Sequence, residues 1–255
     1  MTIKMKICQF IMMMEKIENF DSLNDFLSQI NDNVSIISGN IPVEIQMQYY
    51  KLLEQIYGKS DKTQVANNAQ KLFSKDVDIE EKKKILVSLA LFDDVKFFRI
   101  IEKYYKSPNK ELKQWALMAY HHAKVNLENS FLSEKKILIS TGLGGKNNKL
   151  RYFVVLLADN QDIAFTETQK KVIKNEIEIV FNENNIDLET LTFYDNYLTL
   201  KLLLSFKVPV QNIFQQIIKN CNDLGQFMSE HFIVTNVKEL TSTEIRNIIS
   251  KEEGN

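Results

Sequence analysis

Residues 142–146 read GLGGK, which invites comparison with a loop that binds phosphate. Such a loop needs a glycine five residues before its final glycine, and a serine or threonine directly after the lysine. This sequence has Ser140 and Asn147 at those two positions. The flanking residues predict strand–loop–strand, so no helix N-terminus would receive a phosphate. We therefore expect a flexible hairpin or an interdomain loop rather than a nucleotide site.

The histidines also lack the spacing that a metal site or a catalytic triad requires. His121 and His122 are adjacent, and neighbours on a helix point about 100° apart, so they rarely share one metal ion. No acid or cysteine stands at a suitable spacing from them, and we expect a solvated or half-buried helix end. Ser229, Glu230 and His231 are consecutive and cannot form a catalytic triad by themselves. The sequence predicts no catalytic residue, no metal site and no cofactor.

Composition points to an ordinary globular protein. Of 255 residues, 44% are hydrophobic and 25% are charged, which disfavours a disordered chain. Seven glycines and three prolines are few, which favours long helices over a turn-rich β fold. The net charge of −1 lowers the expectation of strong nucleic-acid binding, although a local basic face can hide within a neutral total.

The cysteines and the N-terminus bear on location. Cys8 and Cys221 give no disulfide framework, so we expect a reducing, cytoplasmic compartment. Residues 7–14 form an apolar run that is too short to span a bilayer and lacks a small-residue cleavage site. Residues 1–14 are therefore predicted to be a ragged or misassigned start, and no membrane partner is expected.

The first half predicts helices throughout roughly residues 15–125. Apolar side chains recur at helical spacing after Pro42, over 62–73, from 79, through 97–105 and after Pro108. The aromatic cluster at 97, 98, 104 and 105 is expected in the core, because base stacking would need exposed rings beside a basic groove. The charge run EEKKK at 80–84 is expected on a solvated face, with its acids at the start of a helix.

Two segments of this half resemble each other at an offset of about thirty residues. EKKKILVSLALFDD and ELKQWALMAYHHAK each follow an amphipathic helix, and paired helices at such a period suggest a solenoid. The stretch SPNKELKQWALMAY resembles the second helix of a HEAT-type repeat. An irregular helical bundle remains the alternative.

The pattern changes after Ser130. Strands are predicted at 150–158, 191–194, 197–206 and 232–237, and helices at 166–182, after Pro209 and after a capping box formed by Thr241 and Glu244. Apolar and polar side chains alternate over residues 198–206, as they do in a strand. Leu203 breaks this alternation, so a helix remains the alternative there. The order βαββαβ is the ferredoxin-like arrangement. The predicted fold class is α+β, with a helical, HEAT-like or bundle domain over 15–145 and a ferredoxin-like domain over 146–255.

From Leu150 onward the chain resembles the single-tyrosine, HUH-type transposases of small insertion sequences and REP-associated elements. The segment from IAFTETQKKVIKN to NIFQQIIKNC is similar to their first helix, central hairpin and second helix. The segment FMSEHFIVTNVKELTSTEIRNIISKEE is similar to their last strand and catalytic helix. The resemblance covers about a hundred residues and rests on order and spacing rather than on an invariant motif.

The resemblance implies a pair of metal-binding histidines on a central strand and a nucleophilic tyrosine on the terminal helix. One match places the histidine positions at Thr199 and Lys201, and another places them at Asn196 and Leu198, while the tyrosine position falls on Ile248. None of these side chains can replace an imidazole pair or a tyrosine hydroxyl. We expect a catalytically inactive domain of transposase ancestry, or else a ferredoxin-like domain with no inherited function.

The sequence hypothesis is therefore a non-enzymatic, cytoplasmic binding or scaffold protein whose partner is a protein. The rival is a protein that binds hairpin single-stranded DNA or RNA and has lost cleavage. Residues 146–255 hold 12 basic and 15 acidic side chains, a balance of −3, which counts against the rival in that half. Because transposases of this type work as dimers, the resemblance also implies a possible homodimer, with an exposed sheet edge as the route.

Overall fold

The computed structural model describes residues 33–132 and 136–252. The chain divides into two compact units, Met1–Ser140 and Thr141–Asn255, where the sequence placed a boundary near residue 145. The predicted ragged start at 1–14 and the helix expected over 15–32 lie outside the described residues.

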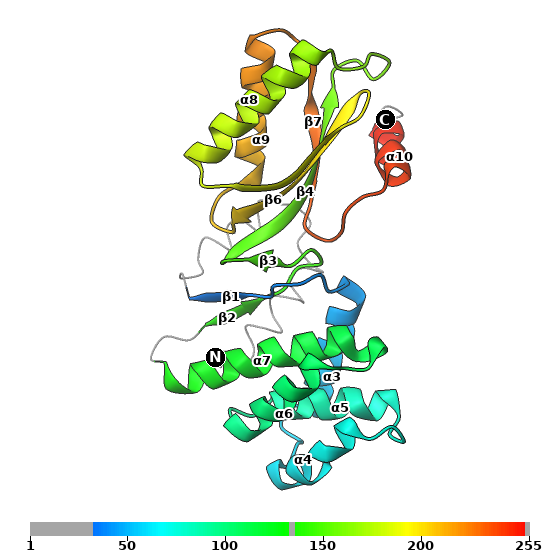
Figure 1. Ribbon diagram of the computed structural model, residues 1–255, viewed down its shortest axis with the longest axis vertical. Helices are drawn as coiled ribbons and strands as arrows, with labels where there is room; N and C mark the ends of the chain where they lie inside the picture. Colours follow the sequence, from blue (N-terminus) through cyan, green and yellow to red (C-terminus); the bar gives the residue numbers. More distant parts are fainter. Residues whose placement is uncertain (1–32, 133–135, 253–255) are drawn as a thin grey trace. The chain divides into compact units, whose positions relative to one another are not determined.

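The first unit is helical, as predicted. Asp61, Asp78 and Asp94 each cap a helix by accepting hydrogen bonds from backbone N–H groups of its first turn. A short 3₁₀ segment replaces the end of the second predicted helix, and another precedes the last helix. The elements are α3 (Val43–Ile56), α4 (Lys62–Asn68), η1 (Ala69–Phe73), α5 (Ile79–Ala90), α6 (Val95–Lys106), η2 (Lys110–Leu112) and α7 (Lys113–Phe131) (Figure 1).

Aromatic side chains build the core of this unit. Tyr49 is fully buried and lies 5.6 Å, between ring centroids, from Trp115. Phe97 and Tyr104 are buried, which confirms that the aromatic cluster belongs to the core. The helices that carry the two similar segments, α5 and α7, contact each other, and α6 lies against both.

The charge run at the start of α5 is less solvated than predicted. Lys82 is only 3% exposed, and Lys83 places its ammonium 4.9 Å from the centroid of the Trp115 ring. Lys83 also pairs with Glu80 at 2.7 Å. Long lysine side chains can pack their aliphatic stems along apolar surface, a behaviour that sequence spacing does not reveal.

One prediction for this unit is wrong. Residues 34–36 form a strand, β1 (Val34–Ile36), and not part of a helix. It pairs in parallel with β2 (Ile137–Ile139), with Val34 opposite Ile137. A strand of three residues is too short to show an alternating pattern, and its partner lies about a hundred residues away in the chain. Only the tertiary pairing makes it a strand.

The second unit has the predicted ferredoxin-like fold. The strand order is β5-β6-β4-β7, and every neighbouring pair in it is antiparallel. β5 and β7 each begin four residues earlier than predicted, so Ser229, Glu230 and His231 lie on β7. The elements are β3 (Gly145–Lys146), β4 (Lys149–Ala158), α8 (Glu167–Glu183), β5 (Asp187–Phe193), β6 (Tyr197–Ser205), α9 (Val210–Asp223), β7 (Met228–Thr235) and α10 (Ser242–Glu252).

The sheet of the second unit is covered on both faces. Helices α8 and α9 pack on one face, as predicted, and α10 lies on the other (Figure 1). Ile245 of α10 packs in a cluster with Phe153, Val155 and Tyr197 of the sheet. Leu203, which breaks the alternation of β6, lies on the face opposite α8 and α9 and is only 3% exposed.

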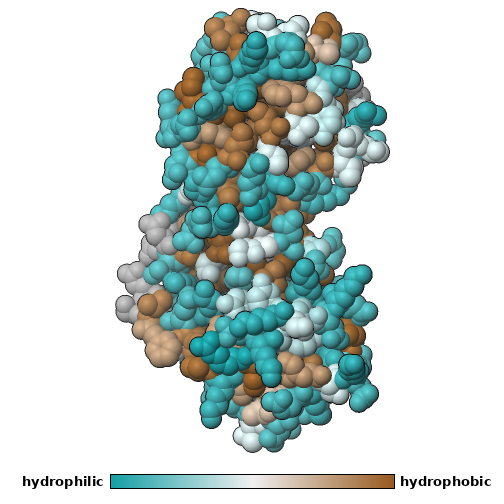
Figure 2. All heavy atoms as spheres, in the orientation of Figure 1, coloured by the Kyte–Doolittle hydropathy of each residue, from teal (hydrophilic) through white to brown (hydrophobic). Residues whose placement is uncertain are grey.

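The surface of both units is mixed. Figure 2 shows hydrophilic side chains over much of the visible face, with hydrophobic ones interspersed, as is usual for globular proteins. Within residues 33–132 and 136–252, no helix is both long enough and apolar enough to cross a membrane.

Candidate functional site

The second unit contains an open pocket between α10 and the turn that joins β5 to β6. Its volume is about 950 Å³. We call it the α10 pocket. The residues that line it come from three places: the loop after β4 (Gln161, Asp162, Ala164), the β5–β6 turn (residues 193–197) and α10 (Ser242, Arg246, Ile249, Ser250).

A stacked pair of tyrosines forms one side of the α10 pocket. The rings of Tyr194 and Tyr197 lie 4.4 Å apart, between centroids, and are within 13° of parallel. Tyr197 is buried and its hydroxyl donates to Ser242 Oγ at 3.2 Å, which ties the sheet to α10. Tyr194 is 41% exposed, so its ring remains available for a further planar or apolar group.

Hydrogen bonds fix the loop after β4 against the turn. The Ala158 N–H donates to the carbonyl of Asn196 at 2.8 Å, and the Phe165 N–H donates to the carbonyl of Asp195 at 2.7 Å. The Asn196 side chain donates to the carbonyl of Gln161. The Oε1 atom of Gln161 is buried and accepts no hydrogen bond within the part of the chain that the structure describes. A buried acceptor without a donor is costly.

The segment before α10 is held by a close backbone approach. The Leu143 N–H donates to the carbonyl of Asn236 at 2.9 Å. A Cβ atom at Gly142 would lie 1.8 Å from the carbonyl oxygen of Val237, so only glycine fits there. The glycines of GLGGK therefore serve a backbone contact and a hairpin. Asn147 and Asn148 have φ of 51° and 59°, which gives the two-residue turn between β3 and β4 and confirms the hairpin prediction.

The predicted capping box starts α10. The Glu244 N–H donates to Thr241 Oγ1 at 3.3 Å, and the Thr241 N–H donates to the Glu244 carboxylate at 2.9 Å. The ammonium of Lys238 pairs with the same carboxylate. Hydrogen bonds from Lys238 and Thr241 lower the pKa of Glu244 to about 2. The helix thus begins at a defined point and presents Ser242 to Tyr197.

The two adjacent histidines do not lie at a helix end, as was predicted, but within α7. His122 is buried, and its Nδ1 lies 3.0 Å from the Tyr49 hydroxyl. Burial, together with Lys124, lowers the pKa of His121 to about 4, so this imidazole is neutral near pH 7. Among the described residues, no group of three or more His, Cys, Asp or Glu side chains could hold a metal ion.

The positions matched to the transposase site lie in different environments. Thr199 is 9% exposed and lies on the same face of β6 as Tyr197, toward α10. Lys201 is on that face too and pairs with Glu239 at 3.0 Å. Leu198 points to the opposite face and is fully buried. Ile248 is half-buried on α10.

The two matches place their residues differently on the sheet. Of the four matched positions, Thr199 and Lys201 lie on the sheet face toward α10. Asn196 lies in the turn and lines the α10 pocket, whereas Leu198 lies beneath the other helices. A histidine pair that works with a residue of the terminal helix would need both positions on its side of the sheet. The match at Asn196 and Leu198 does not meet that condition.

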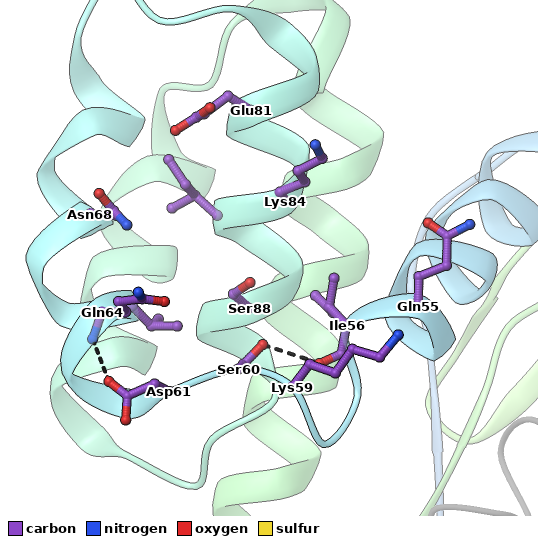
Figure 3. Close-up of a pocket in the computed structure, with 12 residues that line it drawn as sticks. Gln55, Ile56, Lys59, Ser60, Asp61, Gln64, Asn68, Glu81, Lys84 and Ser88 are labelled. Atoms are coloured by element: carbon purple, nitrogen blue, oxygen red, sulfur yellow. Dashed lines mark hydrogen bonds between the residues drawn. The ribbon is translucent and has the colours of Figure 1, made fainter.

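A smaller pocket of about 290 Å³ lies in the first unit between α4, α5 and the end of α3 (Figure 3). Its charges are balanced, with Lys59 and Lys84 against Asp61 and Glu81. Asp61 is already engaged, because it accepts from the Gln64 N–H at 2.9 Å. The balanced lining favours no particular class of ligand.

Sequence reasoning missed the α10 pocket because no single segment contains it. The predicted strands at 191–194 and 197–206 place Tyr194 and Tyr197 on the sheet, but no sequence pattern marks Arg246. The clue in the sequence was the strand prediction itself, since residues three apart across a tight turn can bring their rings together. The placement of α10 over them required the tertiary structure.

No family profile and no curated protein matches the chain. A candidate transposase from Deinococcus radiodurans R1 matches with 15% identity over 42% of this chain and 94% of its own, with a TM-score of 0.37. A REP-associated tyrosine transposase, solved bound to a REP hairpin, matches with 11% identity over 39% of this chain and 61% of its own, with a TM-score of 0.32. The C-terminal domain of MgtC from Mycobacterium tuberculosis matches with 15% identity over 36% of this chain and 93% of its own, at 0.27. The parts matched to these two transposases cover about two fifths of this chain, at low sequence identity.

Proposed function

We propose that the protein is a non-enzymatic binding protein and that the α10 pocket is one of its binding surfaces. The observation that carries this proposal is the pocket itself, which is lined by an exposed tyrosine and an exposed arginine. Tyr194 offers an apolar ring and Arg246 offers hydrogen-bond donors. Such a lining suits a partner with both apolar and polar groups. The balance of −3 in residues 146–255 supports a protein partner.

The absence of cleavage chemistry is part of the proposal. Lys201, at one matched ligand position, is paired with Glu239, and Thr199 at the other is a buried hydroxyl. Ile248 at the matched nucleophile position has no hydroxyl at all. These three side chains support the expectation that metal-dependent nicking does not occur.

Incubation with single-stranded hairpin DNA and Mg²⁺ or Mn²⁺ tests the chemistry. We expect no cleaved product and no protein–DNA adduct that survives denaturation, while an active single-tyrosine transposase assayed alongside gives both. A covalent adduct that disappears when Tyr194 or Tyr197 is changed to phenylalanine would refute the proposal.

A pull-down from the native cell tests the protein partner. The bait is the full chain, compared with Tyr194→Ser and Arg246→Gln variants, in lysate treated with nuclease or mock-treated. We expect at least one protein that survives nuclease treatment, is retained by the wild type and is lost by both variants. If every retained protein binds the variants equally, the α10 pocket is not the binding surface.

The stacked tyrosines favour single-stranded nucleic acid as a second candidate. A base can stack on the exposed ring of Tyr194, and Arg246 lines the same pocket. Stacking of one base contributes about 1–3 kcal/mol, so loss of the ring should lower affinity by about 5- to 150-fold. Fluorescence anisotropy with a labelled oligonucleotide should show this loss for Tyr194→Ser and near-normal binding for Tyr194→Phe. Equal binding by both variants would remove this candidate.

A further inference from the structure

Helix α6 carries a row of exposed cations along one side. The row consists of Lys96, Arg99, Lys103 and Lys106, spaced three, four and three residues apart. At 100° per residue these positions fall within an arc of about 80°, with about 5 Å of helix axis between successive members. All four are exposed. We call this row the basic stripe.

The cations of the basic stripe are largely uncompensated. Arg99 pairs with Glu102 at 2.7 Å. The carboxylate nearest the start of α6, Asp94, is taken by Lys62 at 2.7 Å. Within the part of the chain that the structure describes, Lys96, Lys103 and Lys106 form no ion pair. Residues 95–113 hold six basic and two acidic side chains, a local balance of +4 that the net charge of the chain conceals.

An exposed aromatic ring lies beside the stripe. Phe73 of η1 is 39% exposed, and the Lys103 ammonium lies 5.3 Å from its ring centroid. The Phe73 ring packs against the ring of Tyr104 in an edge-to-face arrangement, with 5.8 Å between the ring centroids. A row of cations next to a supported, exposed ring is the combination that binds single strands, because the cations contact phosphates and a base stacks on the ring.

From this arrangement we infer that the basic stripe and Phe73 form a binding surface for single-stranded nucleic acid. A linear polyanion suits this surface, because the cations lie in a row and the ring beside them offers a face to a base. A membrane surface fits less well, because the apolar side of α6, including Phe97, Ile101 and Tyr104, is buried in the core and cannot insert into lipid. This surface lies on the first unit and is independent of the α10 pocket.

The test is fluorescence anisotropy of a labelled 20-residue oligothymidylate with the full chain at several salt concentrations. The stripe variant is Lys96→Gln, Lys103→Gln and Lys106→Gln. The control is Lys171→Gln, Lys174→Gln and Lys219→Gln, which removes the same charge from α8 and α9. Glutamine has nearly the helix propensity of lysine, so both variants should fold.

The expected effect follows from counterion release. Each phosphate contact on a single strand contributes about −0.7 to the slope of log affinity against log salt, so three contacts contribute about −2. Between 50 and 200 mM salt this corresponds to a loss of about 20-fold in wild-type affinity. We expect the stripe variant to lose this part of the slope and the control to keep it. Phe73→Leu should lower affinity without changing the slope.

Several outcomes would overturn the inference. They are the absence of oligothymidylate binding at 50 mM salt, equal affinity and slope for the two triple variants, and equal or tighter binding of polyglutamate or of phosphatidylserine vesicles. The result for Tyr194→Ser separates the two surfaces. A change at Tyr194 should leave the salt slope intact, whereas the stripe variant should reduce it.

Discussion

Replacing Gly142 with alanine should destabilise the second unit, because the new Cβ would collide with the backbone. The Cβ would lie 1.8 Å from the Val237 carbonyl oxygen, and contacts below 3.0 Å essentially never occur, so the two must separate by at least 3.0 − 1.8 = 1.2 Å. Overpacking of this kind costs about 1–3 kcal/mol. The separation also strains the hydrogen bond from Leu143 N–H to the Asn236 carbonyl, which contributes about 1 kcal/mol. We expect a total loss of about 3 kcal/mol.

Urea unfolding measures this loss unit by unit. The single tryptophan, Trp115, lies in the first unit, so its fluorescence follows that unit, while circular dichroism follows both. Gly142→Ala should lower the midpoint of the dichroism transition that belongs to the second unit and leave the Trp115 transition in place.

A matched control exists in the first unit. A Cβ at Gly39 would lie 2.8 Å from the Cδ2 atom of Leu117, which is the end of a flexible side chain that can move aside. Gly39→Ala should therefore cost under about 1 kcal/mol, within the range of tolerated core changes. If Gly142→Ala costs less than about 0.5 kcal/mol, or no more than Gly39→Ala, the steric reasoning is refuted.

Three further substitutions should change stability, each measurable by urea unfolding. Arg151 holds Glu189 through two hydrogen bonds of 2.6 and 2.7 Å, and this bonding lowers the pKa of Glu189 below its ordinary value. The stability that this interaction contributes is present above the unfolded pKa of about 4.3 and is lost as pH falls through the lower folded pKa. Glu189→Gln should therefore reduce the loss of unfolding free energy at acid pH. An unchanged dependence of the unfolding free energy on pH would contradict this. Asn148→Gly should stabilise the β3–β4 hairpin by about 0.5 kcal/mol, because φ of 59° suits glycine, and a destabilised variant would count against the turn assignment. Thr166→Ala should cost about 1 kcal/mol by removing the capping box of α8, whereas Thr166→Ser should cost little.

The order of elements in the second unit followed from local pattern. Apolar positions recur every three to four residues in α8 and α9, and those on α8 are buried: Ile173, Ile177, Val180 and Phe181. Turn and cap residues then set the element ends, as Thr241 does for α10. For six elements in the order βαββαβ, few topologies satisfy the rules of strand connection, and the ferredoxin-like sheet is one of them. That is why the topology could be predicted from the sequence.

The candidate sites depended on contacts between residues distant in the sequence. Tyr194 could be assigned to a strand end, but its exposure beside α10 follows from how Ile245 packs on the sheet. Lys103 and Phe73 are thirty residues apart, and no periodicity links η1 to α6. The spacing of the basic stripe was readable in the sequence, yet its exposure was known only after Phe97 and Tyr104 were found buried on the other side of the helix.

By itself, the sequence determined the helical first half, the ferredoxin-like order of the second and the absence of imidazole and tyrosine at the positions matched to transposases. Those features depend on residue identity and on spacings of two to four residues, which are local. The tertiary structure alone decided that Val34–Ile36 is a strand, that α10 covers the second sheet face and that Thr199 and Lys201, but not Leu198, face it. Strand pairing and helix docking are settled by the free energy of burial between distant segments, and a local pattern does not contain that information.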